Sequence, residues 1–377
     1  LSLSSSSADE VIQKRILKKD ENAKVYLEDV YDKQKNVMDN LFKFREAVGD
    51  IRGFEGPDEF SVNFPFVPYQ FILMQKVFSE IRKHGNAGKH LSGGERSMLS
   101  GFQEATQRIQ DRDEYSLVSF WMFYDTVHTF LDGSIRQVVE RAERATVNDK
   151  GLEPIDINVL KLLYMIRYVD DIPANLDNIV IMMAEDIGLD KISEKEKIQK
   201  SLDRLIRQNY IARTGDTYNF LTDAEQDVER EIRDEFVDPS EVTRRISEMI
   251  FGSIYTSKKF RYNKKYDFDF NKKVDGMYYG NPVEGMELEI YTTATSLIDK
   301  QELRLMAEST NKVLIVLGDT EYYNFIENAM KIDKFARKKN IPQLSKAMQD
   351  IIRGKQDDAE HYKEDAISEL KEAFNQA

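Results

Sequence analysis

Apolar side chains recur at helical spacing through most of the first 150 residues of the sequence. In residues 69–83 they lie three or four positions apart, with polar residues between them: Phe71, Met74, Val77, Phe78 and Ile81. This period places the apolar side chains on one face of a helix that packs on a core. Residues 23–44, 100–110 and 115–144 show the same period, so the sequence predicts a helical domain over residues 1–150.

Residues 151–235 carry a different order of elements. The apolar period predicts helices over residues 157–169, 176–187 and 193–208. Two short predicted strands, 210–213 and 217–221, then flank Thr214-Gly215-Asp216, a sequence typical of a hairpin turn. Three helices followed by a hairpin are the order of a winged-helix domain, which we predict for this segment.

From residue 236 onward the pattern changes to that of a mixed domain. Residues 286–292 and 312–317 are predicted strands, and the second is a continuous apolar run of the kind buried in an α/β sheet. Helices are predicted over residues 320–338 and 343–374. The sequence thus predicts a multidomain, mainly α protein. It has a helical domain (1–150), a winged-helix domain (151–235) and a smaller α/β or α+β domain (236–377).

The third helix of the second domain has a basic face. Its apolar stripe consists of Ile198, Leu202, Leu205 and Ile206, and the opposite side carries Lys197, Lys200, Arg204 and Arg207. Such a face, with Arg213 on the following hairpin, is where a recognition helix contacts phosphates and base edges. However, Asp and Glu outnumber Lys and Arg by 17 to 10 over residues 153–232. Docking of a protein partner, or a merely solvated face, therefore stays open as an alternative.

A second basic stretch lies at residues 258–273, where aromatic residues alternate with charged ones. It contains seven Lys and Arg against two Asp, and its first cations are Lys258, Lys259, Arg261, Lys264 and Lys265. Aromatic rings on strands beside lysines suit single-stranded nucleic acid, which stacks its bases and is held by its backbone. The alternative is a hairpin whose aromatic residues face a core while its lysines protect a sheet edge. Of the two, we expect the core-facing arrangement.

Composition narrows the classes of protein and of site. The 377 residues are 41% hydrophobic and 32% charged, as in a soluble globular chain of two to three domains. The net charge of −13 means that any contact with DNA must come from a local basic surface. There is no cysteine, and the four histidines form no spaced ligand set, so we expect no metal site. No apolar run is long enough to span a membrane and no signal peptide is present, so we expect a cytoplasmic protein without membrane contact.

A motif-rich segment joins two of the predicted helices of the first domain. Ser92 and Glu95 have the spacing of a capping box that opens a helix, which places Arg96 in the first helical turn. A cation is disfavoured there by the helix dipole, so Arg96 is suited to an anion outside the helix; a solvated surface arginine is the alternative. Leu91-Ser92-Gly93-Gly94-Glu95 has the look of an ABC signature, and Gly85-Asn86-Ala87-Gly88-Lys89 of a phosphate loop. Neither holds. His90 follows Lys89 where a P-loop needs Ser or Thr, and the run 117–124 ends in Asp125-Thr126 instead of the adjacent acids of a Walker B strand.

The wider segment resembles a known family. Phe64-Pro65-Phe66-Val67-Pro68-Tyr69-Gln70-Phe71, the run Gly88-Lys89-His90-Leu91-Ser92-Gly93-Gly94-Glu95-Arg96-Ser97-Met98-Leu99, and Phe102-Gln103 are similar to the large P-loop ATPases of BREX bacteriophage-exclusion systems. This family comprises BrxC and its relative PglY, resembles AAA+ proteins, and matches the sequence through at least Tyr291.

The resemblance implies a role for part of a larger ATPase. Gly93-Gly94-Glu95-Arg96 matches the lid motif that presents a sensor-2 arginine, so Arg96 is the expected contact to the γ-phosphate of ATP. The Walker-motif core is expected upstream and is absent here, so the chain has no complete active site and no cofactor of its own. ATP and Mg²⁺ are expected for the full-length protein, which would be an ATPase. Expected partners are DNA, other BREX subunits and further copies of the protein; a non-enzymatic DNA-binding or adaptor module is the alternative.

Overall fold

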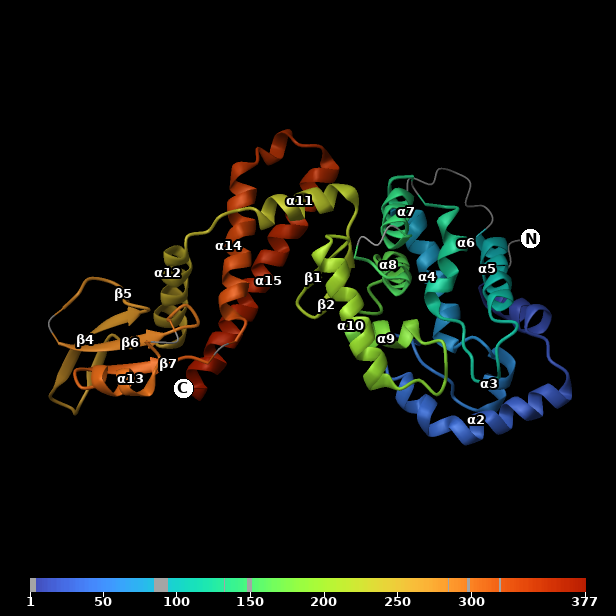
Figure 1. Cartoon of the computed structure of the whole chain (residues 1–377), viewed down its shortest axis with the longest axis horizontal. Coiled ribbons are helices and arrows are strands. Elements are labelled where there is room, and N and C mark those ends of the chain that lie inside the picture. Colours follow the sequence, from blue (N-terminus) through green and yellow to red (C-terminus); the bar gives the residue numbers. More distant parts are fainter. Residues whose placement is uncertain are drawn as a thin grey trace. The chain divides into compact units, whose positions relative to one another are not determined.

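The structure is a computed structural model that describes residues 5–84, 94–131, 133–147, 151–283, 285–296, 299–318 and 320–377. The chain divides into two compact units, Leu1–Gln226 and Asp227–Ala377 (Figure 1). It is mainly helical, with 61% of residues in helices, and it has a mixed sheet near the C-terminus. The mainly α class predicted from the sequence is therefore confirmed at this level.

The first part of unit 1 is mainly helical, as its apolar period predicts, but the helical stretch predicted over residues 115–144 begins only at Phe120 and is divided into three elements. Its elements are α1 (Ser5–Val11), the π-helix η1 (Ile12–Ile16), α2 (Glu21–Leu41), α3 (Pro57–Asn63), α4 (Pro68–His84), α5 (Gly94–Arg108), the 3₁₀-helix η2 (Phe120–Phe123), α6 (Tyr124–His128) and α7 (Gly133–Val147). The proline-punctuated entry to α4 lies at the centre of the core. Phe66 is fully buried, and its ring centroid lies 4.7 Å from that of Phe102. Gln70, also fully buried, accepts a hydrogen bond from Val67 N at 3.0 Å and donates one to Val118 O at 2.6 Å.

Residues 151–220 form three helices and a hairpin, as predicted. They are α8 (Pro154–Ile166), α9 (Leu176–Met183), α10 (Lys191–Arg207), β1 (Ile211–Thr214) and β2 (Thr217–Phe220). The antiparallel strands meet at Thr214 and Thr217, and Gly215 takes the positive φ of +58° that this tight turn requires. A feature that the sequence did not predict is a third extended segment: Asn175 forms a bridge with Thr217, and Tyr218 N donates to Ala174 O at 3.0 Å.

One hydrophobic cluster runs from Ala8 to Phe220. The residues of the first two predicted domains thus share a core within unit 1. The domain boundaries at 150 and 235 stay predictions.

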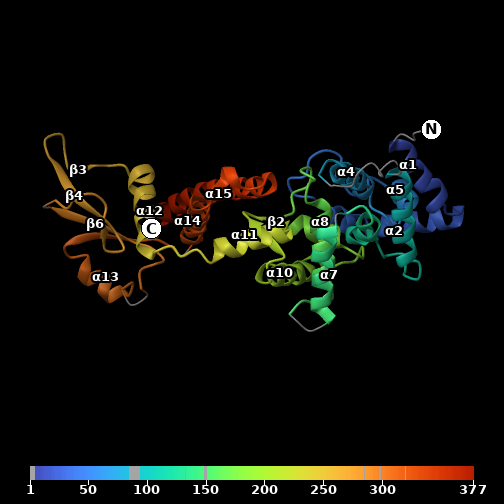
Figure 2. The same cartoon turned by 90° about the horizontal axis from the view of Figure 1, so that it is seen from above.

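Unit 2 combines a sheet with long helices. The helical elements are α11 (Asp223–Arg233, which contains the boundary between the units), α12 (Pro239–Met249), η3 (Ile250–Ile254), α13 (Glu302–Glu308), α14 (Tyr322–Lys338), η4 (Ile341–Gln343) and α15 (Lys346–Gln376). The strands are β3 (Lys259–Arg261), β4 (Asp267–Val274), β5 (Met277–Tyr278), β6 (Met286–Tyr291) and β7 (Lys312–Val316). Helices α14 and α15 lie side by side, as both views show (Figures 1 and 2).

The sheet of unit 2 is mixed. Its order is β3-β4-β6-β7, with β5 paired to β4. Strands β4, β6 and β7 are parallel, whereas β3 and β5 are antiparallel to β4. The core between the sheet and the helices includes Val274, Ile290, Ile246, Ile326 and Leu370, all at 1% exposure or less. None of the helices in the described ranges combines the length and apolar character needed to cross a bilayer.

Candidate nucleic-acid interface

The basic stretch 258–273 forms a hairpin of β3 and the first half of β4. Phe260 lies directly opposite Phe268, and the pairing continues toward the turn, where Tyr262 N donates to Tyr266 O at 3.1 Å. Residues opposite each other in an antiparallel pair share a face, and so do residues two apart along a strand. The two phenylalanines and two tyrosines therefore form a continuous aromatic ladder on one face of the hairpin.

The aromatic ladder faces solvent. Exposure is 47% for Phe260, 70% for Tyr262, 59% for Tyr266 and 51% for Phe268. The expected core-facing arrangement is therefore wrong. The reason is that the core covers β4 only from Phe270 onward, while its first three residues are exposed and β3 is exposed throughout. The hairpin lies at the end of the sheet away from α14 and α15 (Figures 1 and 2).

The cations of the hairpin fall into two groups. On the face opposite the ladder, Arg261 Nε lies 3.0 Å from Asp267 Oδ1, and Lys259 Nζ lies 3.5 Å from Asp269 Oδ1, so these two charges are largely compensated. A second group of lysines is exposed and makes no ion pair within the described part of the chain: Lys258, Lys264 and Lys265. The aromatic ladder thus has uncompensated positive charge at its root and at its tip.

The tip has a defined conformation. Asn263 Oδ1 accepts hydrogen bonds from Lys265 N at 2.8 Å and from Tyr266 N at 3.1 Å. An asparagine that accepts from the backbone two and three residues ahead closes a turn by itself. This turn presents Lys264 and Lys265 beside the two tyrosines.

The basic face of α10 has three exposed members rather than four. Lys197, Lys200 and Arg207 are exposed, and Lys197 Nζ lies 3.4 Å from Glu194 Oε1. Glu196 and Asp203 are also exposed on α10, so its exposed surface has mixed charge. The face therefore has less net positive charge than its lysines and arginines alone suggest.

Arg204 occupies a different environment from its predicted companions. Its side chain is 16% exposed, and it donates from Nε to Asp156 Oδ2 at 2.8 Å and from Nη2 to Asp156 Oδ1 at 2.7 Å. Asp156 is fully buried and also accepts a hydrogen bond from Glu153 N at 2.8 Å. It is the N3 residue of the capping box that opens α8. The guanidinium thus joins α10 to the start of α8, a geometry that leaves it little freedom to contact DNA.

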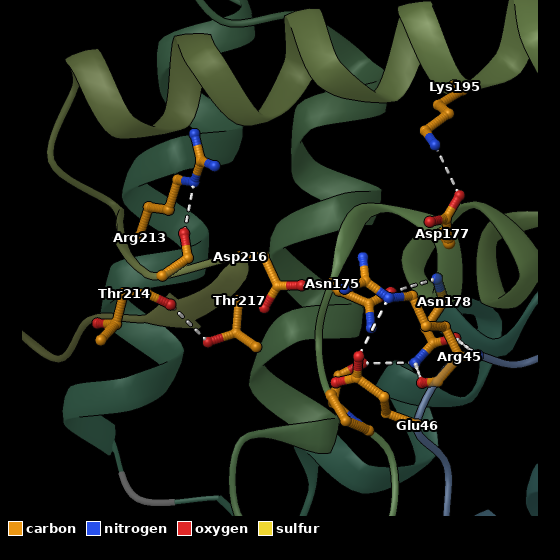
Figure 3. Close-up of polar contacts among 12 residues, drawn as sticks. Arg45, Glu46, Asn175, Asp177, Asn178, Lys195, Arg213, Thr214, Asp216 and Thr217 are labelled. Atoms are coloured by element: carbon orange, nitrogen blue, oxygen red, sulfur yellow. Dashed lines mark hydrogen bonds and ion pairs between the residues drawn. The ribbon is translucent and has the colours of Figure 1, made fainter. Parts of the chain in front are cut away.

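The turn between β1 and β2 is tied to the segment after α2 (Figure 3). Arg45 Nη2 lies 3.1 Å from Asp216 Oδ2, while the backbone of Arg45 exchanges two hydrogen bonds, of 2.8 and 2.9 Å, with the side chain of Asn178. Arg213 is exposed, and its Nε donates to Gly215 O at 2.9 Å. The side chain of the predicted site residue Arg213 therefore contacts the turn of its own hairpin.

Most of unit 2 is similar to a known protein family. Residues 235–377 match the family model described as "BREX ATP-binding protein BrxC 4th domain with six-stranded beta sheet". This match supports a BrxC-family protein of a BREX system. No solved structure matches it. The resemblance stated from the motifs of unit 1 is thus confirmed by a match in a different part of the chain.

The matched segment contains the whole aromatic hairpin. The described residues build a five-stranded sheet where the family description has six strands. The nucleotide-contacting residue predicted for the family, Arg96, lies in the first turn of α5, but its side chain and residues 85–93 lie outside the described residues. Its assignment stays a prediction. Within the described residues, no group of three or more acidic or histidine side chains is placed to hold a metal ion.

One basic cluster was not predicted from the sequence. It lies on η1, the segment that follows it and the beginning of α2: Lys14, Arg15, Lys18, Lys19 and Lys24. The signal was present as five cations within eleven positions, in a chain of net charge −13. It was missed because a charged run on a helix is usually only solvated, and nothing in the spacing shows that the run borders a pocket.

Proposed function

We propose that this chain is the post-core portion of an AAA+-type ATPase of a BREX system, and that it binds single-stranded DNA through the aromatic ladder of the β3–β4 hairpin. The observation that carries the proposal is the exposure of four aromatic rings on one face, bordered by uncompensated lysines. Soluble proteins seldom leave such a surface uncovered unless it binds a partner.

The chemistry of the aromatic ladder suits unpaired bases. Stacking of a base on an aromatic side chain contributes about 1–3 kcal/mol and tolerates any base, because every base has a π-face. Rings arranged along two paired strands offer successive stacking positions. Lys258, Lys264 and Lys265 supply the charge that a phosphate backbone needs, and they do so in a chain whose overall charge of −13 would otherwise repel it.

A second DNA contact is proposed for residues 154–220. Helix α8, the extended pair Ala174-Asn175, helices α9 and α10, and the β1–β2 hairpin follow the order of a winged-helix domain. In that domain α10 would be the recognition helix, and its exposed cations Lys197, Lys200 and Arg207 would contact phosphates. The acidic neighbours on α10 make this the weaker of the two contacts.

The nucleotide-dependent part of the proposal rests on the family resemblance. Arg96 would contact the γ-phosphate of ATP held with Mg²⁺ by a core outside this sequence, and movement of the helical lid would transmit the nucleotide state to the DNA contacts. Self-association would accompany the ATPase core, and other BREX subunits would be further partners.

A second candidate function is that of an adaptor that binds protein. It is favoured by exposed apolar side chains on α13, where Leu303 is 83% and Met306 is 64% exposed. The two functions differ in their response to salt. Binding of DNA weakens steeply as salt rises because counterions are released, whereas binding through apolar side chains changes little.

The test is fluorescence anisotropy of a labelled single-stranded oligonucleotide with the double variant Phe260→Ala/Phe268→Ala. The loss of two stacking rings predicts at least a tenfold fall in affinity, because each ring contributes about 1–3 kcal/mol. Phe236→Ala is the matched control, since Phe236 is 70% exposed in the same unit but lies outside the ladder. Equal binding by the double variant and the wild type would overturn the proposal.

A further inference from the structure

A pocket of about 750 Å³ lies in unit 1, far along the sequence from the proposed DNA contacts. Its charged lining comes from η1, the segment that follows it and the beginning of α2: Lys14, Arg15, Lys18, Lys19, Glu21 and Lys24. Five cations against one carboxylate make it a strongly positive concavity on an acidic chain. Its size is within the range of small-molecule binding sites.

The π-helix positions this lining. Leu17 N donates to Ile12 O at 2.9 Å, which closes the wider turn of η1, and Ile12 and Leu17 are both buried. With these two apolar anchors fixed, Arg15 and Lys18 are exposed at the pocket. Asp20 then caps α2 by accepting from Ala23 N at 2.7 Å. A π-helical turn costs hydrogen-bond geometry and is frequently found at functional sites.

Two of the five cations already have partners. Lys14 forms an ion pair with Glu10, and Lys24 Nζ lies 2.9 Å from Glu21 Oε1. Within the described part of the chain, Arg15, Lys18 and Lys19 form no ion pair. Three positive charges at one pocket are therefore left without a carboxylate.

Lys19 is the most informative of the three. It is partly buried, and its Nζ donates to two neutral oxygens, Leu17 O at 2.9 Å and Val62 O at 3.4 Å. Burial, together with the nearby charge of Lys24, lowers the pKa of Lys19 to about 8. A cation held in this way destabilises the folded protein unless an anion neutralises it. The carbonyls fix its position, and its charge remains available to a ligand.

We propose that this pocket binds a run of phosphate groups. Lysine and arginine side chains that converge on a pocket are the usual ligands of phosphate oxygens. No aromatic side chain lines the pocket within the described residues, so recognition is of the phosphates rather than of a base. The phosphates would belong either to the chain of a free nucleotide or to a nucleic-acid backbone. This site is independent of the aromatic hairpin, which belongs to the other unit.

Isothermal titration calorimetry of the whole chain tests the proposal. Inorganic tripolyphosphate, ATP and a single-stranded oligonucleotide are titrated in turn, and the oligonucleotide is used in the Phe260→Ala/Phe268→Ala background so that the hairpin does not contribute. Binding of tripolyphosphate and ATP would assign the phosphates to a nucleotide. Binding of the oligonucleotide alone, weakened by Arg15→Glu/Lys18→Glu, would assign them to a nucleic acid, since α10 is unchanged in that variant. Absence of binding by all three would overturn the proposal.

Charge-reversal variants locate the binding. The double variant Arg15→Glu/Lys18→Glu changes two exposed side chains, so the fold is retained, and it should weaken binding at least tenfold. Lys35→Glu is the matched control, because Lys35 is an exposed lysine of α2 that does not line the pocket. If the control and the double variant weaken binding equally, the interaction is a general charge effect and the pocket is not the site.

Discussion

The ion pair between Arg204 and Asp156 allows a sharp test of which basic residues on α10 face a ligand. Asp156→Ala removes both carboxylate oxygens that hold the guanidinium, at 2.7 and 2.8 Å, and it also removes the acceptor for Glu153 N in the capping box of α8. Breaking a buried ion pair from one side costs about 3–5 kcal/mol. Since Arg204 keeps 16% exposure and a second carboxylate, Glu153, at 3.2 Å, we expect about 3 kcal/mol.

The assay is urea unfolding followed by circular dichroism. Arg204→Ala should destabilise unit 1 by an amount similar to Asp156→Ala, because each variant leaves the other charge without its partner. Lys200→Ala is the matched control: it removes an exposed cation from the same helix and should change the free energy of unfolding by less than about 0.5 kcal/mol. If Arg204→Ala proves as mild as Lys200→Ala and yet weakens DNA binding, the structural assignment of Arg204 is wrong.

Three further predictions follow from the same contacts. Lys19→Met should stabilise the fold at pH 7 by about 1–2 kcal/mol in thermal or urea unfolding. The pKa of Lys19 is lowered in the folded protein, so its protonated side chain is less favourable there than in the unfolded chain, and methionine removes this cost. The free energy is set below the full value of the pKa shift because Lys19 is partly exposed. Burial acts to raise the pKa of Glu225, but hydrogen bonds from Arg167, at 2.6 and 2.8 Å, outweigh it and leave the pKa lowered. The stability of the protein should therefore fall as the pH drops below about 4.5, and the fall should be smaller in Glu225→Gln. Lys264→Glu/Lys265→Glu should reduce the slope of log affinity against log salt for single-stranded DNA by about 1.4, and an unchanged slope would show that these lysines contact no phosphate.

The elements of the fold were largely readable from the sequence because each has a local cause. The apolar period predicted most helices of unit 1, and Thr214-Gly215-Asp216 predicted the β1–β2 turn. The period did not show that the stretch 115–144 is interrupted. The extended pair Ala174-Asn175 was missed, because it pairs through only a bridge to β2 and has no strand period of its own. The partner of Asn175 is Thr217, more than forty positions along the chain, and a pairing over that separation cannot be predicted from a local sequence pattern.

The environment of the candidate sites was harder to predict, since it depends on what packs nearby. Alternation along 258–273 predicted that the aromatic residues share a face, but not that the core ends at Phe270 and leaves them exposed. Helical spacing placed Arg204 beside Lys200 and Arg207, but it contained no information about Asp156 on α8. In both cases the deciding residue lies on another element or farther along the strand.

Photo-crosslinking tests the central claim most directly. A single-stranded oligonucleotide carrying 5-bromouracil is irradiated with the whole chain, and the attached peptides are identified by mass spectrometry. The account predicts crosslinks at Phe260, Tyr262, Tyr266 or Phe268, because a base stacked on a ring lies within bonding distance of it. Crosslinks confined to other segments, with the hairpin peptides recovered unmodified, would contradict it.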